Sequence, residues 1–119
     1  MSNEMKEIIA VIRPERWKQT RQAIFDGGGM GVTQQRALGR GQQSGLTYLS
    51  MLSVDGPQTV GYLPKRVVSC VVAAKDVDAV LDGIIKANQS GNKGDGKIFV
   101  CPIENAVRIR TGEDGLGAL

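Results

Sequence analysis

Residues 67–85, VVSCVVAAKDVDAVLDGII, decide the fold, because they place a buried strand directly before an amphipathic helix. The run VVSCVVAA at 67–74 is apolar and rich in β-branched residues, which predicts a buried strand. Asp76 is a residue type that caps helices. After it, one helix face is marked at the i, i+3, i+4, i+7 spacing by Val77, Val80, Leu81 and Ile84. Gly91 ends the helical segment.

The N-terminal half of the chain repeats this order. EIIAVIRP, residues 7–14, predicts a strand closed by Pro14, and proline suits the first turn of a helix. Residues 15–26 then place three side chains on one stripe at helical spacing, namely Trp17, Thr20 and Ile24. GGG at 27–29 ends this helix, and GVTQQRALG at 31–39 predicts the next strand.

Two further segments predict strands near the C-terminus, KIFVC at 97–101 and the alternating AVRIRT at 106–111. The halves repeat at a spacing of roughly 60 residues, the length of a β-α-β unit plus a connection. Two such units form a ferredoxin-like α+β fold, a double βαβ with a four-stranded antiparallel sheet and both helices on one face. The other sheet face then needs a cover, which trimerisation or another close assembly would supply.

The segment between the two units, residues 40–58, shows no sustained period and is rich in Gly, Ser and Gln. A loop of this length in so small a domain is uncommon and is usually functional or disordered. Its few apolar residues, Leu46, Leu49, Met51 and Leu52, are either weak anchors or a partner-binding face.

The stretch SGNKGDGKIFV, residues 90–100, resembles a phosphate-binding loop at first sight. Gly91, Gly96 and Lys97 satisfy most of the pattern G-x-x-x-x-G-K-[ST], but Ile98 stands where a hydroxyl should help to hold magnesium. A true P-loop follows a strand and opens a helix, whereas here a helix ends and a strand begins. The Gly-Asp-Gly turn can still expose backbone N–H groups to an anion. A tight helix-to-strand turn without a ligand is the competing interpretation.

Cationic and glycine-rich segments elsewhere fit an anionic ligand. Arg108 and Arg110 lie two apart on the predicted strand, so both side chains leave by one face, where phosphate oxygens suit guanidinium geometry. GRGQQSG at 39–45 permits close backbone approach, Arg40 offers a charge, and Lys65 follows the loop directly after Pro64. Each feature also has an interpretation without a ligand. The two arginines could lie on a solvated strand edge, residues 39–45 could form a flexible linker, and Lys65 could be an exposed surface lysine.

Composition limits the class of protein. The 119 residues suit one domain, 1–119, and with 41% hydrophobic but only 4% aromatic residues the core must be aliphatic. The net charge of +3 is scattered and lacks aromatic platforms, which disfavours nucleic-acid binding. Cys70 and Cys101 lie in apolar runs without zinc-site spacing, so we expect free buried thiols. No apolar stretch is long enough to span a bilayer and MSNEMKE is no signal peptide, so we expect a cytoplasmic protein.

These motifs occur together, and in order, in one known family. GDGKIFV followed by RIRTGE, with GRGQQSG and LPK upstream and EIIAVIRP at the start, strongly resembles the nitrogen regulatory PII signal-transduction proteins. The resemblance covers nearly the whole chain. It implies a homotrimer, ATP or ADP bound in the clefts between protomers, and 2-oxoglutarate sensed together with Mg-ATP. It also identifies residues 41–58 as the T-loop, which docks onto targets such as an ammonium transporter, nitrogenase or a biosynthetic enzyme.

The resemblance also implies roles for single residues. The nucleotide-binding positions are Thr33, Gly39, Gly41, Gln42, Gly94, Asp95, Gly96, Lys97, Arg108 and Arg110. The 2-oxoglutarate positions are Gln43, Gly45 and Lys65, and Gln43 is also the magnesium ligand. No catalytic residue is implied, so the protein is expected to be a sensor and not an enzyme.

Three residues depart from the family pattern, two at positions of the ligand site and one at the loop position that is modified in some members. Ser69 replaces a glutamate that is frequent in the nucleotide cleft, and Gln42 replaces an arginine or lysine. Tyr48 lies in LTYLSML and does not match the setting of the tyrosine that is uridylylated in the enterobacterial proteins. The divergent loop is more like that of nitrogenase-associated PII paralogues.

Two other hypotheses remain open at this point. The first is a PII-like sensor retuned to another metabolite, such as bicarbonate or adenylates alone, that regulates a transporter or a carbon-metabolism target. The second is an ATP-hydrolysing enzyme. The absence of His, and of an obvious water-activating carboxylate near the glycine turns, disfavours the enzyme.

Overall fold

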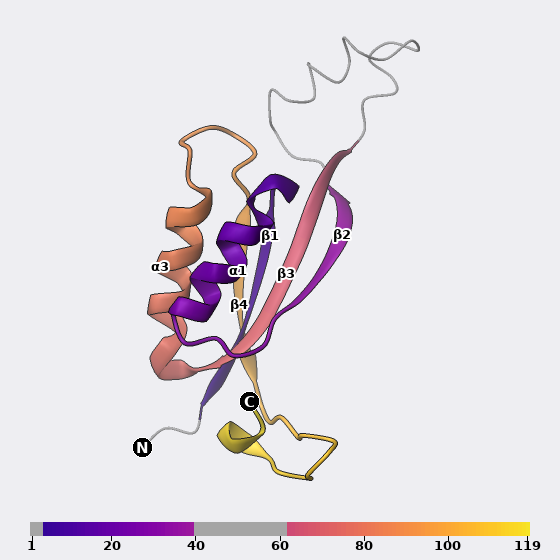
Figure 1. The fold of residues 1–119 in the computed structure, drawn as a ribbon, viewed down its shortest axis with the longest axis vertical. Coiled ribbons are helices and arrows are strands. Elements are labelled where there is room, and N and C mark those ends of the chain that lie inside the picture. The colour runs from indigo at the N-terminus through magenta and orange to yellow at the C-terminus, as the bar shows by residue number, and fades with distance from the viewer. Residues whose placement is uncertain (1–3, 40–61) are drawn as a thin grey trace.

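The computed structural model describes residues 4–39 and 62–119. Within them, two βαβ halves form a four-stranded sheet with strand order β2-β3-β1-β4, in which every neighbouring pair is antiparallel (Figure 1). The ferredoxin-like fold expected from the sequence is therefore confirmed. The first half consists of β1 (Met5–Ile12), the 3-10 turn η1 (Pro14–Arg16), α1 (Trp17–Asp26) and β2 (Thr33–Gly39). The second half consists of β3 (Leu63–Ala73), η3 (Ala74–Asp76), α3 (Val77–Asn88) and β4 (Lys97–Ile103).

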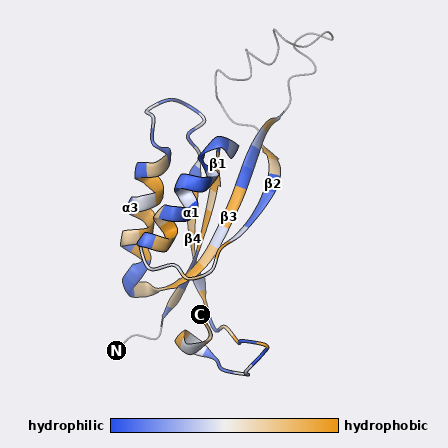
Figure 2. Cartoon of the chain, viewed as in Figure 1, coloured by the Kyte–Doolittle hydropathy of each residue, from blue (hydrophilic) through white to orange (hydrophobic). Residues whose placement is uncertain are grey.

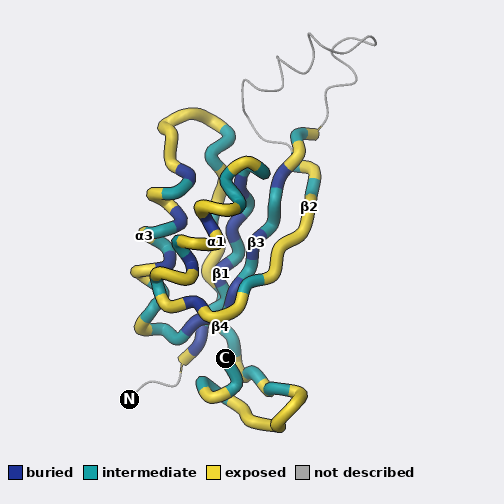
Figure 3. The backbone as a smooth tube through the Cα atoms, in the orientation of Figure 1, coloured by how far each residue is buried: buried dark blue, intermediate teal, exposed yellow. Residues whose placement is uncertain are grey.

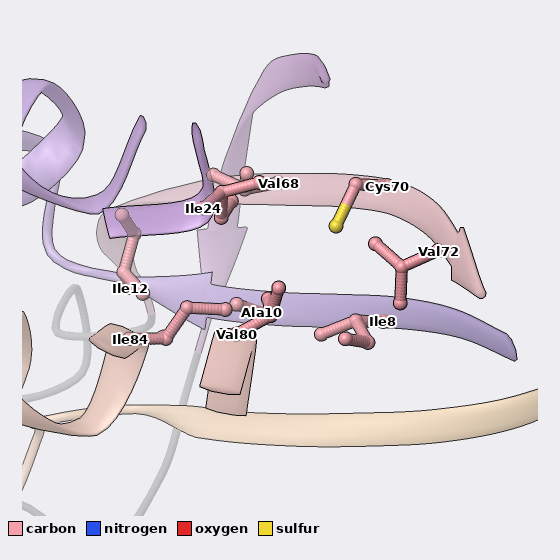
Figure 4. Close-up of a cluster of buried hydrophobic side chains, with 9 residues drawn as sticks. All are labelled: Ile8, Ala10, Ile12, Ile24, Val68, Cys70, Val72, Val80 and Ile84. Carbon is pink, nitrogen blue, oxygen red and sulfur yellow. The ribbon is translucent and has the colours of Figure 1, made fainter. Parts of the chain in front are cut away.

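Both helices lie on one face of the sheet, and the core fills the space between them and the central strands. Burial alternates from Ile8 to Ile12 in β1 and from Val68 to Val72 in β3, because successive side chains of a strand point to opposite faces. The buried cluster in Figure 4 joins residues from both central strands and both helices, namely Ile8, Ala10, Ile12, Ile24, Val68, Cys70, Val72, Val80 and Ile84. The aliphatic core expected from the composition is confirmed.

One buried polar contact joins the helices close to the end of α3. Asn88 Nδ2 donates to Thr20 Oγ1 at 2.9 Å, and Thr20 Oγ1 donates to the Arg16 carbonyl at 2.7 Å. Asn88 is the last residue of α3, so this contact fixes the point at which the chain leaves the helix and turns toward β4.

The opposite sheet face has no covering element in the described part of the chain. Val67, Ser69 and Val71 of β3 point to this face and are only half-buried, whereas the residues between them point to the helices and are buried in the core. On β4, Phe99 keeps 51% of its surface exposed. Figure 3 shows the two edge strands largely exposed. The run at 67–74 is therefore buried on one face alone within a single protomer.

Three local expectations need correction. Residues 106–111 do not form a strand: Val107 makes an isolated bridge to Asp114, and a turn lies between them. Asp76 occupies the N-cap position of α3, but its side chain makes no capping hydrogen bond. Cys70 is buried as expected, whereas Cys101 is only half-buried; both thiols are free.

No helix in residues 4–39 or 62–119 is long and apolar enough to cross a membrane.

Candidate functional site

The connection between α3 and β4, residues 89–96, is the turn that the sequence marked by its glycines; we call it the 89–96 turn. It lies at the end of the sheet where β1 ends and β3 begins, and Figure 2 shows it as mostly hydrophilic. Gly94 and Gly96 have φ of 95° and 113°, a region that L side chains rarely adopt. A Cβ on Gly96 would lie 1.9 Å from the Val11 carbonyl oxygen, so the turn can pass this close to β1 only with glycine there.

The Asp95 carboxylate holds the 89–96 turn together. Its Oδ2 accepts from the Ser90 and Gly91 backbone amides at 2.8 and 3.0 Å, and its Oδ1 accepts from Ser90 Oγ at 2.5 Å. Oδ1 also accepts from Arg13 Nη1 at 2.7 Å, which ties the turn to the end of β1. The Ser90 hydrogen bonds, followed by the one from Arg13, hold the pKa of Asp95 well below its usual range.

Lys65 is a buried lysine at the start of β3, with only 8% of its surface exposed. Its Nζ donates to the Gly94 carbonyl at 3.1 Å, so this ammonium contacts the same turn. Burial lowers the pKa of Lys65 and nearby Arg13 lowers it further, while Glu15 and Asp95 act in the opposite direction. Gly39 leaves room for the lysine stem, because a Cβ at that position would lie 3.1 Å from Lys65 Cγ.

Arg13 is a site residue that sequence reasoning missed. Its guanidinium reaches both Asp95 and the Lys93 carbonyl, the second at 3.0 Å. In the sequence, Arg13 stands directly before Pro14, which marks the end of the predicted strand. In the structure this strand, β1, pairs with both β3 and β4. That register brings Arg13, Lys65 and the 89–96 turn together, although they are far apart in the sequence.

An open cavity of about 590 Å³ lies beside this group, a size that suits a small ligand. Lys65 lines it together with Arg36 and Arg66, which face each other in register across β2 and β3. Arg66 Nη1 donates to Gln34 Oε1 at 2.5 Å. Like charges directly opposite each other repel, so the cavity favours an anionic ligand.

The segment after β4, which contains Arg108 and Arg110, lies at the other end of the sheet from the 89–96 turn (Figure 1). Lys97 pairs with Val11 and Ile103 pairs with Met5, so the seven residues of β4 separate the two ends by about 20 Å. Arg108 binds Glu113 Oε1 at 3.3 Å and the Leu119 carbonyl at 2.9 Å, and Arg110 is exposed. One protomer therefore does not bring these arginines to the turn.

The remaining predicted site residues divide into two groups. Thr33 is exposed at the start of β2 and pairs with Ser69, and Lys97 is exposed at the start of β4. Outside the described residues lie Arg40, Gly41, Gln42, Gln43, Gly45 and Tyr48, together with the T-loop segment 41–58. The described residues contain no group of three His, Cys, Asp or Glu that could hold a metal ion.

Comparison with known proteins gives a consistent result. The family model described as "Nitrogen regulatory protein P-II" matches residues 5–113. A "Nitrogen fixation nifHD region GlnB-like protein 2" of Methanothermobacter marburgensis is 41% identical, over 97% of this chain and 100% of that protein. "Nitrogen regulatory protein P-II" of Rhizobium meliloti is also 41% identical, over the same shares of the two chains.

Two solved structures resemble the fold closely. The B. subtilis GlnK-ATP complex has a TM-score of 0.79 at 28% identity, covering 100% of this chain and 99% of that one. Arabidopsis thaliana PII bound to citrate has a TM-score of 0.77 at 30% identity, covering 98% and 92%.

Proposed function

This chain belongs to the nitrogen regulatory protein P-II family, and on that premise we propose that it is a homotrimeric sensor of adenine nucleotides and 2-oxoglutarate. ATP or ADP would bind in the clefts between protomers. Residues 41–58 would act as the T-loop and would bind or release a target of nitrogen metabolism according to the ligand bound.

The observation that carries this proposal is the group of two cations at the 89–96 turn. Lys65 has three ammonium donors, is almost fully buried, and donates to a single acceptor among the described residues, the Gly94 carbonyl. Burying an ammonium is costly unless acceptors or an anion compensate it. Arg13 adds a second cation beside it. A dicarboxylate such as 2-oxoglutarate supplies the missing acceptors and the opposite charge.

Nucleotide phosphates fit the other side of the same turn. Gly94 and Gly96 allow the backbone to approach an anion closely, and Lys97 offers an exposed charge directly after them. Gly94, Gly96 and Lys97 would hold the phosphates, with Thr33 and Gly39 around the rest of the nucleotide. Gly41, Gln42, Gln43 and Gly45 would complete the site from the loop, with Gln43 on the magnesium ion.

A second protomer is part of the proposal because Arg108 and Arg110 follow the end of β4 that lies about 20 Å from the turn within one protomer. If they bind phosphate, they must come from a neighbouring copy. The uncovered apolar face with Phe99 supports the same assembly, because exposed apolar surface favours association.

A second candidate is a sensor of the same construction for a small anion other than 2-oxoglutarate. The facing arginines Arg36 and Arg66 on the cavity beside Lys65 support it, because they add two positive charges to the pair formed by Arg13 and Lys65. Calorimetric titration of 2-oxoglutarate, citrate and bicarbonate, each with Mg-ATP and with ADP, separates the two candidates.

The experiment that tests the leading proposal uses Lys65→Ala, with the exposed Lys75→Ala as its matched control. We expect Lys65→Ala to abolish the heat of 2-oxoglutarate binding while ADP affinity stays within about threefold of wild type, because the lysine contacts the effector and not the nucleotide. Lys75→Ala should change neither. If Lys65→Ala removes both ligands together, the assigned role is wrong.

A further inference from the structure

Arg36 and Arg66 form a pair of facing cations on the ribbon that β2 and β3 make at one edge of the sheet. They lie directly opposite each other in the antiparallel register, so their side chains leave by the same face. Arg36 is exposed and Arg66 half-buried, and within residues 4–39 and 62–119 neither forms an ion pair. Arg66 donates to the neutral side chain of Gln34, which orients the guanidinium without neutralising it. Because like charges opposite each other repel, the pair favours a negatively charged partner.

The pair lies on the face of the ribbon opposite to the one where we propose that the effector binds. Arg66 pairs with Ile12 of β1, which is buried in the core beneath the helices, so Arg66 lies on the helix side of the sheet. Lys65 is its neighbour along β3 and therefore points to the other face. There its Nζ donates to the Gly94 carbonyl. The two arginines are thus not needed to hold an anion at Lys65.

Apolar residues surround the arginine pair and give the cavity beside it a mixed character. Leu38, Pro64 and Pro14 line this cavity of about 590 Å³ together with the two arginines. Leu38 lies opposite Pro64 in register and keeps 69% of its surface exposed. A free inorganic anion would pair with the guanidinium groups but would leave these apolar groups in water. A peptide segment whose carboxylates flank an apolar side chain contacts both kinds of group.

We propose that Arg36, Arg66 and the apolar residues beside them form a docking surface for an acidic segment of the target protein, separate from the ligand sites. β2 ends at Gly39 and β3 begins at Leu63, so both arginines lie close to the points where the chain enters and leaves the segment that contains residues 41–58. The inference rests on the proposed function in one respect, namely that this segment contacts the target. A target held there brings its neighbouring residues to the ribbon, where two carboxylates can each pair with one guanidinium.

An acidic peptide tests the proposal without knowledge of the target. The probe is Glu-Glu-Leu-Glu-Glu, blocked at both ends, titrated into the isotope-labelled full-length protein and followed by NMR. We expect it to shift the backbone signals of Arg36, Leu38 and Arg66, and to bind more weakly as salt is added, because salt screens exposed charges. The uncharged peptide Gln-Gln-Leu-Gln-Gln should not bind. Inorganic phosphate at the same ionic strength should bind to this surface at least about tenfold more weakly than the acidic peptide.

Two double variants separate a specific surface from general attraction to a basic protein. Arg36→Gln with Arg66→Gln should weaken binding of the acidic peptide by about tenfold or more, because both charge-assisted contacts are lost. Lys75→Gln with Lys86→Gln removes the same net charge from exposed positions outside the cavity and should change the affinity by less than about twofold. The affinity for 2-oxoglutarate at saturating Mg-ATP, measured by calorimetry, should stay within about threefold of wild type in both.

Peptide binding that depends on the arginines, with 2-oxoglutarate binding retained, supports the inference. Equal weakening in the two double variants, no peptide binding at millimolar concentration, or phosphate binding as tight as that of the peptide overturns it and leaves the proposed function standing. Loss of 2-oxoglutarate or citrate binding in the arginine variant also overturns it, because the arginines then belong to the effector site. Wild-type protein that binds the peptide through the arginines but binds neither nucleotide nor 2-oxoglutarate contradicts the proposed function and leaves the docking surface standing.

Discussion

The connection from α1 to β2 and the connection from α3 to β4 occupy equivalent places in the repeated βαβ unit, yet different chemistry holds them. After α1, two of the glycines at 27–29 pack on apolar side chains: a Cβ on Gly29 would lie 2.5 Å from Ile24 Cγ2, and one on Gly27 3.0 Å from Val80 Cγ2, whereas one on Gly28 would meet the Asp76 carboxylate. After α3, the 89–96 turn is held by the Asp95 carboxylate, Arg13 and Lys65. The duplicated fold thus uses one helix-to-strand turn for packing and the other for charge.

The difference explains why we propose a ligand site at only one of the two turns. The side chains nearest to the glycines of the first turn are Ile24, Val80 and the negatively charged Asp76, so they include no cation for an anion. The second turn lies where β1 ends. Arg13, directly after β1, therefore lies beside this turn, and so does Lys65 at the start of β3. Topology places both turns, and the residues at the strand ends put two cations beside the second turn alone.

The largest expected effect comes from Gly96→Ala in the charged turn. The new Cβ would meet the Val11 carbonyl at 1.9 Å in a backbone with φ of 113°, and a backbone atom cannot move aside as a side chain can. We expect a loss of about 3 kcal/mol or more in the free energy of unfolding, measured by urea denaturation.

Two further glycine substitutions complete this test. Gly29→Ala meets the Cγ2 methyl of buried Ile24 at 2.5 Å and the Ile24 carbonyl oxygen at 3.1 Å, and should cost about 1–3 kcal/mol. Gly91→Ala has φ of 85° but open space around it, and should cost about 1–2 kcal/mol from backbone strain alone. If Gly96→Ala is no worse than Gly91→Ala, the close approach of the turn to β1 is wrong.

A smaller effect is expected in the pH dependence of stability. The native pKa of Asp95 lies below its ordinary value, so its stabilisation is fully present above about pH 4–5 and is lost as the pH falls through the native pKa. Asp95→Asn should therefore be less stable than wild type at pH 7, and the gap should close toward pH 2. Thermal unfolding between pH 2 and pH 7 measures it.

The matched variant for the pH experiment is Asp26→Asn at the end of α1, beside the first turn. Asp26 accepts a single exposed hydrogen bond, from Gln22 Nε2 at 2.9 Å. Its substitution removes a carboxylate that folds no turn, so the pH profile of Asp26→Asn is the reference for that of Asp95→Asn. A gap for Asp95→Asn that does not change between pH 7 and pH 2 would show that the charge does not hold the second turn.

The smallest effect is expected for Gln22→Ala, which removes that i, i+4 contact at the first turn. Exposed pairs of this kind stabilise helices by about 0.2–0.5 kcal/mol, so the midpoint of urea unfolding should scarcely move. A loss above about 1 kcal/mol would mean that the first turn also depends on polar contacts, which would remove the contrast between the two turns.

The sequence predicted the fold well because its local signals agree with one another. Val77, Val80, Leu81 and Ile84 mark one helix face, and Pro14 marks the start of η1, and the structure places both as expected. The strand predicted at 106–111 failed because alternation alone cannot tell a strand from a turn when no neighbour pairs with it; Arg108 instead binds Glu113 and the Leu119 carbonyl.

The candidate site was predicted less completely, because its contacts are long-range. Gly94, Gly96 and Lys97 stand in one motif and were found from it, whereas Arg13 and Asp95 are 82 positions apart and meet only through strand register. The residues next to Lys65 in the sequence do not predict its burial, because that burial depends on Gly39 and Gly94, which are distant in the sequence. A single chain also leaves the roles of Arg108 and Arg110 untested, because they follow the end of β4 that lies away from the turn.

The central claim is that the charged turn forms one site for nucleotide and effector together. Calorimetric titration of 2-oxoglutarate into the purified wild-type protein, with and without Mg-ATP, tests it most directly. The account predicts binding only when Mg-ATP is present. Equal binding in the absence of nucleotide would contradict it.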